Sequence, residues 1–547
     1  MAHLRPRQER LAGSHHRGHR LHRTAGRERI PGSRDLLEAG GGHGRGLPLR
    51  LLPGPVRPRR LPVPDGPGDQ RLLPVQAPAR PRARAGRDQG SRIRGATGLR
   101  SMVGRTAADG GSRGRPRRSS WGCLALAFGF VLSSCVRLHP PPSAPPSPAT
   151  PALADLTDAQ WLRDLDHLRR NINRVHENLM YSLAGHREFE DRARLFREAL
   201  PSLNVDERTA GLLRVVAALN DPHTQIAFRP TRRFPLAFFW FKEGLFVTAV
   251  EPGLERLLGA ELAGIDRASL ASVISLLSEL VPHENESRLK DRLPVLLPLG
   301  EVLRGLGLIP SADKASFTFR DLEGKTFEAE VEARPWTAGR PKWARRAAGE
   351  TPLFLSDMDT FYWYEYLEGS RTLFFQYNSC HDMPGRPFHE FSDALLAFIR
   401  GHEVDRVVID LRHNPGGYSQ LLRPFIRGLA RLRKIDHPDG LYVIVGRRTF
   451  SAAVLNALEL RRSTRAVLVG EPTGGKPSHY GDIRLFALPA SRLTVSYPTQ
   501  YIWREGVLET SMVPDHVVEP SVRDWIAGRD PVLEGILRGD FRQNEAP

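Results

Sequence analysis

Apolar residues recur at helical spacing where the regular part of the chain begins. Six of them follow one another at intervals of four and three residues: Trp161, Leu165, Leu168, Ile172, Val175 and Leu179. This spacing places all six on one face of a helix. We therefore predict a helical region over residues 155–228, with the apolar face as its core rather than as a binding stripe for a partner.

Residues 229–335 contain short apolar stretches typical of strands, such as Leu245–Val250 and Ala315–Phe319. Between these stretches, the segment LLGAELAGIDRASLASVISLL at 257–277 resembles part of a PDZ-like module, although a clear carboxylate-binding loop is missing. We predict a β-rich region here. It either binds peptides or serves as a structural spacer, and both interpretations stay open.

The longest regular pattern runs over residues 350–535, where apolar strands alternate with helical stretches. The predicted strands are 372–377, 406–411, 441–445 and 466–469, and the predicted helices are 388–399, 421–432 and 452–460. Such alternation is typical of β-α-β units on a parallel sheet. We therefore predict an α/β domain, followed by a short tail at 536–547. Loops that follow such strands are where chemistry concentrates.

Charge divides the chain sharply. The formal net charge is +18, and the first 120 residues hold 27 Arg, no Lys and 8 acidic residues, against 52 basic and 53 acidic residues in the remainder. The globular part therefore gives no electrostatic case for nucleic acid. Residues 1–112 are rich in Arg, Pro and Gly and lack aromatic residues, so we predict disorder there. An Arg-rich RNA-binding tail is one interpretation; we favour upstream sequence included by a misplaced start.

A targeting segment follows at 113–135. Four arginines precede the apolar run WGCLALAFGFVL, which ends in Ser133-Ser134-Cys135. A basic stretch, a short apolar run and small residues are typical of a secretory signal peptide, and the ending resembles a bacterial lipobox. The run is shorter than the roughly 20 residues of a spanning helix, although a single membrane anchor with a chance Cys is the alternative. We expect translation to start near Met102 and Cys135 to carry a lipid. The protein would then sit lipid-anchored on the outer side of a membrane of the bacterial cell envelope, with residues 136–154 as a Pro-rich linker.

Three glycine-containing turns each follow a predicted strand: DLRHNPGG at 410–417, GRRTFSAA at 446–453 and GEPTGGK at 470–476. Twin glycines let the backbone approach a ligand and present N–H groups to an oxyanion. A serine that opens a helix sits where N–H groups and the helix dipole stabilise negative charge. Each turn alone is also compatible with an ordinary loop or helix cap.

In this order the three turns resemble the C-terminal-processing (tail-specific) serine peptidase family, with tricorn-like features. Three further segments resemble other landmarks of that family: Asp221–Thr224, Val513–Asp515 and Gly528–Leu533. The resemblance covers residues 155–535. It implies a catalytic domain of the ClpP/crotonase type, and a serine endopeptidase that cleaves extracytoplasmic proteins or peptides through an acyl-enzyme.

The same resemblance implies roles for single residues. Ser451 matches the nucleophile, and its own N–H or that of Ala452, together with the turn at Gly416 and Gly417, matches the oxyanion hole. Two proton acceptors remain open. Lys476 lies 25 residues after the serine, as in the processing peptidases, and would have to be neutral to act.

The tricorn-like branch of the family implies a different base. His223 matches its histidine, and Glu509 matches an acidic residue that fixes the tautomer of that histidine. We leave the choice between His223 and Lys476 open and place Glu509 below both. His223 and Glu509 also have purely structural interpretations, as a helix-end histidine that caps backbone carbonyls and as a solvent-facing strand residue.

Several alternatives remain. Val454 and Tyr480 replace residues that are usual near the nucleophile and the lysine, which motivates a catalytically inactive, lipid-anchored peptide-binding or scaffold protein of the same fold. A crotonase-type acyl-CoA enzyme is a weaker option. Cys380 beside His381 could form a thiol site, although a strand-end role fits better. His413, His479 and His516 lack zinc spacing, so we expect no metal and no cofactor.

Overall fold

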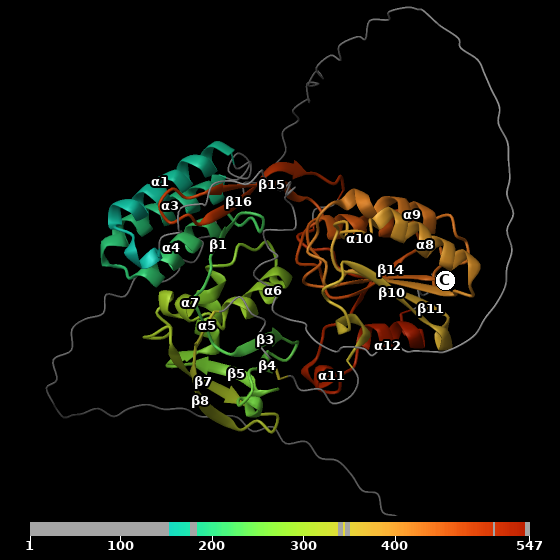
Figure 1. Cartoon of the computed structure of the whole chain (residues 1–547), viewed down its shortest axis with the longest axis horizontal. Helices are drawn as coiled ribbons and strands as arrows, with labels where there is room; N and C mark the ends of the chain where they lie inside the picture. Colours follow the sequence, from blue (N-terminus) through green and yellow to red (C-terminus); the bar gives the residue numbers. More distant parts are fainter. Residues whose placement is uncertain (1–151, 176–182, 337–342, 345–350, 507–508, 542–547) are drawn as a thin grey trace, which may run out of the picture. The chain divides into compact units, whose positions relative to one another are not determined.

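The computed structural model describes residues 152–175, 183–336, 343–344, 351–506 and 509–541, and all of them belong to the compact unit Ser112–Pro547 (Figure 1). The predicted signal segment with Cys135, the misplaced-start segment and nearly all of the linker lie outside the described residues, as does Leu179. Within the described part, no helix is both long enough and apolar enough to cross a membrane. The boundaries that we drew between regions stay predictions.

The first region is helical, as expected. Its main helices are α1 (Asp158–Val175), α3 (Leu183–Ala199) and α4 (Val205–Ala217). Four residues of the predicted apolar face, Trp161, Leu165, Leu168 and Ile172, are fully buried. Helix α4 begins with a capping box, because Asn204 and Glu207 bond each other's backbone N–H groups.

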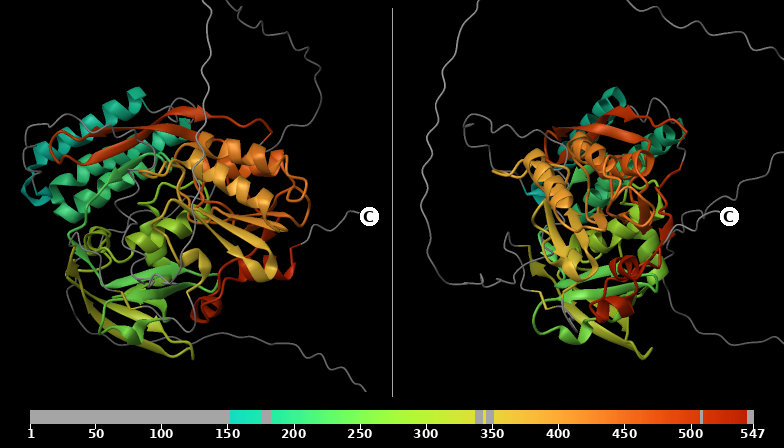
Figure 2. Two further views of the ribbon diagram at one scale, coloured as in Figure 1. Left: turned by 45° about the vertical axis from the view of Figure 1, so that its right-hand side comes forward. Right: turned by 90° about the vertical axis from the view of Figure 1, so that its right-hand side faces the viewer.

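A hairpin from much later in the chain completes this helical core. Strands β15 (His479–Ala487) and β16 (Thr494–Ile502) pair antiparallel, and β16 also pairs with β1 (Gln225–Ala227). Figure 2 shows this hairpin lying along the N-terminal helices, and Leu488, Leu493 and Val495 share one hydrophobic cluster with them. The buried carboxylate of Asp164 accepts the N–H groups of Ala490 and Ser491 at 2.7 and 2.8 Å. A segment that the sequence pattern joined to the α/β domain therefore packs against the N-terminal helices.

The second region is β-rich, as expected. An antiparallel sheet has the order β3-β4-β5-β7-β8, with a short β6 (Ala268–Ser269) beside β5. Its strands are β3 (Leu236–Trp240), β4 (Leu245–Val250), β5 (Glu261–Ile265), β7 (Lys314–Arg320) and β8 (Thr326–Glu332). Helices α5 (Leu270–Ser278), α6 (Glu286–Leu296) and α7 (Gly300–Gly305) share its hydrophobic core. Whether this region binds peptides stays a prediction.

The third region is the predicted α/β domain. Its sheet has the order β10-β11-β12-β13-β14-β17, antiparallel only between β10 and β11 and parallel elsewhere. The strands are β10 (Tyr362–Leu367), β11 (Thr372–Tyr377), β12 (Arg406–Asp410), β13 (Leu441–Val445), β14 (Val467–Gly470) and β17 (His516–Val517). The fold class read from the sequence is confirmed.

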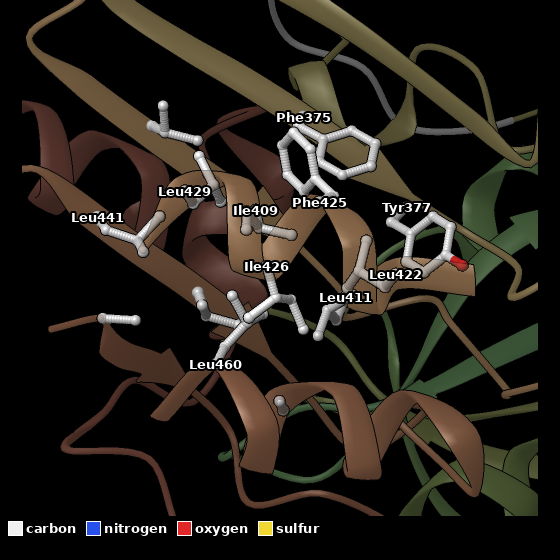
Figure 3. Packing of buried hydrophobic residues seen from close by; sticks show 14 of the residues in the cluster. Phe375, Tyr377, Ile409, Leu411, Leu422, Phe425, Ile426, Leu429, Leu441 and Leu460 are labelled. Atoms are coloured by element: carbon white, nitrogen blue, oxygen red, sulfur yellow. The ribbon is translucent and has the colours of Figure 1, made fainter. Parts of the chain in front are cut away.

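Helices cover both faces of this sheet. Helices α8 (Phe388–Gly401), α9 (Arg423–Leu429) and α10 (Ala452–Ser463) pack on one face, and α12 (Pro531–Arg538) packs on the other. Figure 3 shows Phe425, Ile426 and Leu429 of α9 and Leu460 of α10 in the first of these cores. Successive side chains of strand β12 point to opposite faces of the sheet: Val407 and Ile409 belong to the first core, and Val408 belongs to the second. Helix α9 begins later than we predicted, because Pro424 lacks an N–H and suits the first turn. The three glycine-containing turns all follow parallel strands at the same edge of the sheet.

Candidate active site

Ser451 has an unusual backbone. It stands between β13 and α10 with φ 50° and ψ −122°, and its side chain makes no capping hydrogen bond to the helix. A residue with a β-carbon adopts positive φ at an energetic cost, and such strain concentrates at functional sites. Ser451 is also 8% exposed. The serine is therefore no ordinary helix cap.

Neighbouring groups hold this strained turn in place. The hydroxyl of Thr449 donates to the carbonyl of Leu411 at 2.8 Å and accepts the N–H of Gly446 at 3.0 Å. The N–H of Phe450 donates to the carbonyl of Asn414 at 3.1 Å. The loop after β13 is thus bonded to the loop after β12.

The twin-glycine turn lies directly against the serine. Gly416 and Gly417 have φ of 110° and 133°. A β-carbon on Gly416 would lie 2.9 Å from Ser451 Cβ and 3.0 Å from the nitrogen of Ala452. The N–H of Gly416 already donates to Asn414 Oδ1 at 2.9 Å, so the N–H groups of Gly417 and Ala452 are the candidate oxyanion donors.

Buried amide side chains and a buried thiol form hydrogen bonds around this turn. Asn414 donates to the carbonyl of Tyr377 at 2.8 Å. The N–H of Cys380 donates to the carbonyl of Gly416 at 3.0 Å, and its thiol donates to Asn414 at 3.5 Å and to Asn456 at 3.4 Å. Cys380 is fully buried. Its geometry fits the strand-end role rather than a thiol nucleophile.

His223 lies beside Phe450, the residue that precedes Ser451. Its ring centroid is 4.6 Å from that of Phe450 and 5.4 Å from that of His479, on which it stacks. Its Nδ1 is 3.8 Å from the Asp221 carboxylate, and its Nε2 is buried without a hydrogen-bond partner in the described part of the chain. Burial lowers the pKa of His223 to about 3, which Asp221 partly opposes. The imidazole is therefore neutral at neutral pH.

His479 forms the other side of this stack. Its Nδ1 is 2.8 Å from the carbonyl of Lys476; because a carbonyl only accepts, Nδ1 carries the proton. Burial lowers the pKa of His479 to about 4. The hydroxyl of Ser496 donates to the carbonyl of His223 at 2.9 Å, so the β15–β16 hairpin holds both histidines.

Lys476 is engaged elsewhere. Its ammonium forms an ion pair with Glu284, which precedes α6 in the β-rich region. The lysine side chain is 23% exposed and that of the glutamate 11% exposed. Burial raises the pKa of Glu284 to about 7, and Lys476 opposes this rise. A lysine that is paired as an ammonium has no lone pair with which to accept a proton.

The remaining predicted residues lie apart from this cluster or outside the description. Glu509 is exposed, whereas the carboxylate that the structure places beside His223 is Asp221. Cys135 is not among the described residues. Those residues contain no group of three or more His, Cys, Asp or Glu side chains that could hold a metal ion.

Sequence reasoning missed Glu284 and Arg288 as neighbours of the site. The guanidinium of Arg288, on α6, lies 4.2 Å from the centroid of the Phe450 ring. No local pattern marks either residue, because both reach the site through a contact between distant segments. Asp221 was noticed only as part of a family landmark.

Part of the sequence and the fold of the described residues are similar to known proteins. Residues 431–518 match peptidase family S41. The fold is similar to mature CPAF complexed with lactacystin, at 13% identity and TM-score 0.51 over 70% of this chain and 97% of that chain, and to mature CPAF at 14% identity and TM-score 0.50 over 70% and 98%. A photosystem II D1 C-terminal processing protease matches at 15% identity and TM-score 0.31, over 72% of this chain and 99% of that chain. No curated protein sequence matches.

The fold, together with the family match over the segment that carries Ser451, defines a peptidase. The segment of the α/β domain that is similar to peptidase family S41 contains β13, α10 and β14, and thus the turn that carries Ser451. The resemblance read from the sequence is confirmed, and protein or peptide substrates follow from it. The roles of single residues stay predictions.

Proposed function

We propose that the chain is a serine endopeptidase that uses Ser451 as nucleophile and His223 as general base. The observation that carries the proposal is the position of Ser451, which is strained at positive φ and pressed against the Gly416 turn. An α/β turn that only connects a strand to a helix has no need of this strain. Residues held this way are typical of reactive centres.

The proposed reaction follows from the neighbouring groups. Ser451 Oγ attacks the peptide carbonyl carbon while its proton passes to neutral His223, and the carbonyl electrons become an oxyanion that accepts N–H groups from Gly417 and Ala452. His223 then returns the proton to the leaving amine, and water hydrolyses the resulting acyl-enzyme. Charging a buried imidazole is unfavourable, but Asp221 at 3.8 Å and the oxyanion formed in the same step both offset that penalty.

The contact between Lys476 and Glu284 supports His223 as the base. A lysine base would have to leave this ion pair before it could accept a proton from Ser451. His223, in contrast, is neutral because it is buried. The contacts of the two residues therefore favour His223 over Lys476 as the base.

Three substitutions test this proposal. Ser451→Ala should abolish peptide cleavage and labelling by a fluorophosphonate, and His223→Gln should lower kcat by roughly a thousandfold. Lys476→Arg keeps a cation for Glu284 but cannot accept a proton, so most activity should remain. His389→Gln, at a highly exposed histidine, is the matched control. An inactive Lys476→Arg enzyme beside an active His223→Gln enzyme would make Lys476 the base.

The positions that suggested an inactive scaffold are explained by packing. Val454 is fully buried in the core beneath the sheet, and the ring of Tyr480 packs on Tyr501 at 4.7 Å. Neither departure from the usual residues removes a group from the cluster around Ser451. Loss of catalysis is therefore not favoured.

We also propose that the enzyme is lipid-anchored through Cys135 on the outer side of a bacterial envelope membrane, where it meets extracytoplasmic proteins or peptides. The support is the sequence of residues 113–135. Intact mass of the purified protein should show an acylated Cys135 as the first residue, and Cys135→Ala should release the protein from membranes. Peptides from residues 1–100 in the mature protein would contradict the misplaced start.

A further inference from the structure

Glu284 enters the candidate site from outside the α/β domain. It stands directly before Asn285, the N-cap residue of α6, and α6 is anchored in the core of the β-rich region through Leu293. Its carboxylate pairs with Lys476, the last residue of the turn that follows β14. A side chain of the β-rich region thus contacts a turn of the α/β domain.

Asn285 makes two more contacts at the same place. Its amide donates to the carbonyl of Gly474 at 3.2 Å and to that of Thr510 at 2.7 Å. A β-carbon on Gly474 would lie 3.5 Å from Arg288 Cα, so the first turn of α6 packs closely on the glycine. The segment that begins α6 therefore touches the turn through an ion pair, a hydrogen bond to Gly474 and backbone packing, and it also bonds Thr510 beside the turn.

The opposite side of that turn touches the nucleophile. The N–H of Gly475 donates to the carbonyl of Thr449 at 3.2 Å, and a β-carbon on Gly475 would lie 3.0 Å from the backbone nitrogen of Ser451. The Thr473 hydroxyl donates to the carbonyl of Gly475 at 2.7 Å and fixes the turn internally. The turn is therefore enclosed between the start of α6 and the backbone of Ser451.

We propose that Glu284 and Asn285 form a clamp from the β-rich region that positions the turn Gly470–Lys476 against Ser451, with Lys476 as the partner of Glu284 and not as proton acceptor. This inference rests on the proposed function of Ser451. Glu284 and Lys476 are positioning residues, because they act on the reacting atoms through the glycines of the turn. The catalytic domain then depends on a neighbouring region for its geometry.

Charge makes the clamp sensitive to pH. Lys476 and Arg288 favour the carboxylate of Glu284, whereas burial and Asp221 oppose it, and its pKa is raised to about 7. The stacked histidines His223 and His479 are neutral in this range. As pH falls through about 7, Glu284 takes up a proton and its charge no longer holds Lys476. Activity should therefore decline on the acid side of neutrality.

Glu284→Gln in the full chain tests the clamp. We expect kcat for a peptide substrate to fall about tenfold, because small displacements of a reacting group lower rates steeply, while KM changes little and the acid limb near neutrality disappears. Glu286→Gln is the matched control, since Glu286 stands two residues away and pairs with Lys290 while 75% exposed. A Lys476→Met change should add little to Glu284→Gln, because both remove the same pair.

The outcomes are separable. A Glu284→Gln enzyme that matches Glu286→Gln in kcat and pH profile, or effects of Glu284→Gln and Lys476→Met that add in full, would overturn the clamp. If Glu284→Gln fails to fold by circular dichroism, Asn285→Ala decides by the same kcat criterion. Failure of Ser451→Ala to abolish fluorophosphonate labelling would instead overturn the proposed function, whatever Glu284 does.

Discussion

The ring of His223 lies 4.6 Å, centroid to centroid, from the ring of Phe450, and Phe450 is joined directly to Ser451. The histidine follows α4, the phenylalanine belongs to the turn after β13, and the guanidinium of Arg288 on α6 lies over the same phenylalanine ring. All three regions therefore contact the residue beside the nucleophile. Substitutions that shift any of these regions should therefore alter the position of Ser451.

Gly416→Ala should abolish most activity without unfolding the protein. The added β-carbon would lie 2.9 Å from Ser451 Cβ, so either the serine or the oxyanion turn has to move. We expect kcat to fall by about a hundredfold or more, the scale for losing an oxyanion donor. Gly385→Ala is the control, because Gly385 also has positive φ but open space around it. Equal activity of the two variants would contradict the close contact.

His479→Gln should flatten the acid side of the stability profile. The ordinary pKa of histidine is 6.5, and burial lowers that of His479 to about 4, so the unfolded chain binds the proton more tightly. The contribution to stability is complete above pH 6.5 and is lost as pH falls toward about 4, on the order of 3 kcal/mol in total. Urea unfolding at pH 7.5 and 4.5 measures it. A free-energy difference between variant and wild type that is the same at both pH values would contradict this account.

Arg447→Met should destabilise the protein substantially. The Arg447 side chain is 5% exposed, pairs with Glu471 and donates to the carbonyl of Trp240 in the β-rich region at 2.5 Å. Removing the arginine leaves Glu471, whose side chain is only 15% exposed, without its counter-charge, which costs up to about 3–5 kcal/mol. Chemical unfolding should show the loss. Arg423→Met removes a pair at a 44%-exposed arginine and should cost no more than about 1 kcal/mol; comparable losses would argue against the burial effect.

Asp164→Ala should loosen the β15–β16 hairpin. The carboxylate of Asp164 is fully buried and accepts N–H groups from Ala490 and Ser491, so its removal leaves both donors unsatisfied. We expect a loss of about 3 kcal/mol in unfolding free energy and faster proteolysis between β15 and β16. Asp158→Ala, at a 51%-exposed partner of Arg208, is the control. Unchanged cleavage of the hairpin would contradict its dependence on Asp164.

Local pattern was enough to predict much of the fold. Strands β11, β12, β13 and β14 lie where apolar runs predicted them, because the interior strands of a parallel sheet are buried on both faces and read as continuous apolar stretches. The helical face from Trp161 to Ile172 followed from periodicity in the same way.

The rest depended on contacts between distant segments. Asn285 meets Gly474 across 189 residues of sequence, and no periodicity records such a meeting. The docking of the hairpin on α1 spans 326 residues. Glu509 was singled out because its spacing from Ser451 matches a family pattern. A single acidic residue at a given distance carries little information, and the side chain of Glu509 is exposed in the structure.

The hairpin also has a consequence for synthesis. A chain leaves the ribosome from its N-terminus, so α1, α3 and α4 emerge long before Leu488 and Val495, which complete their core. Ser496, which holds His223, emerges later still. Nascent chains that end before residue 479 should therefore be digested readily and should not react with a fluorophosphonate. Under the proposed function, a nascent chain should therefore lack peptidase activity until its hairpin has been synthesised.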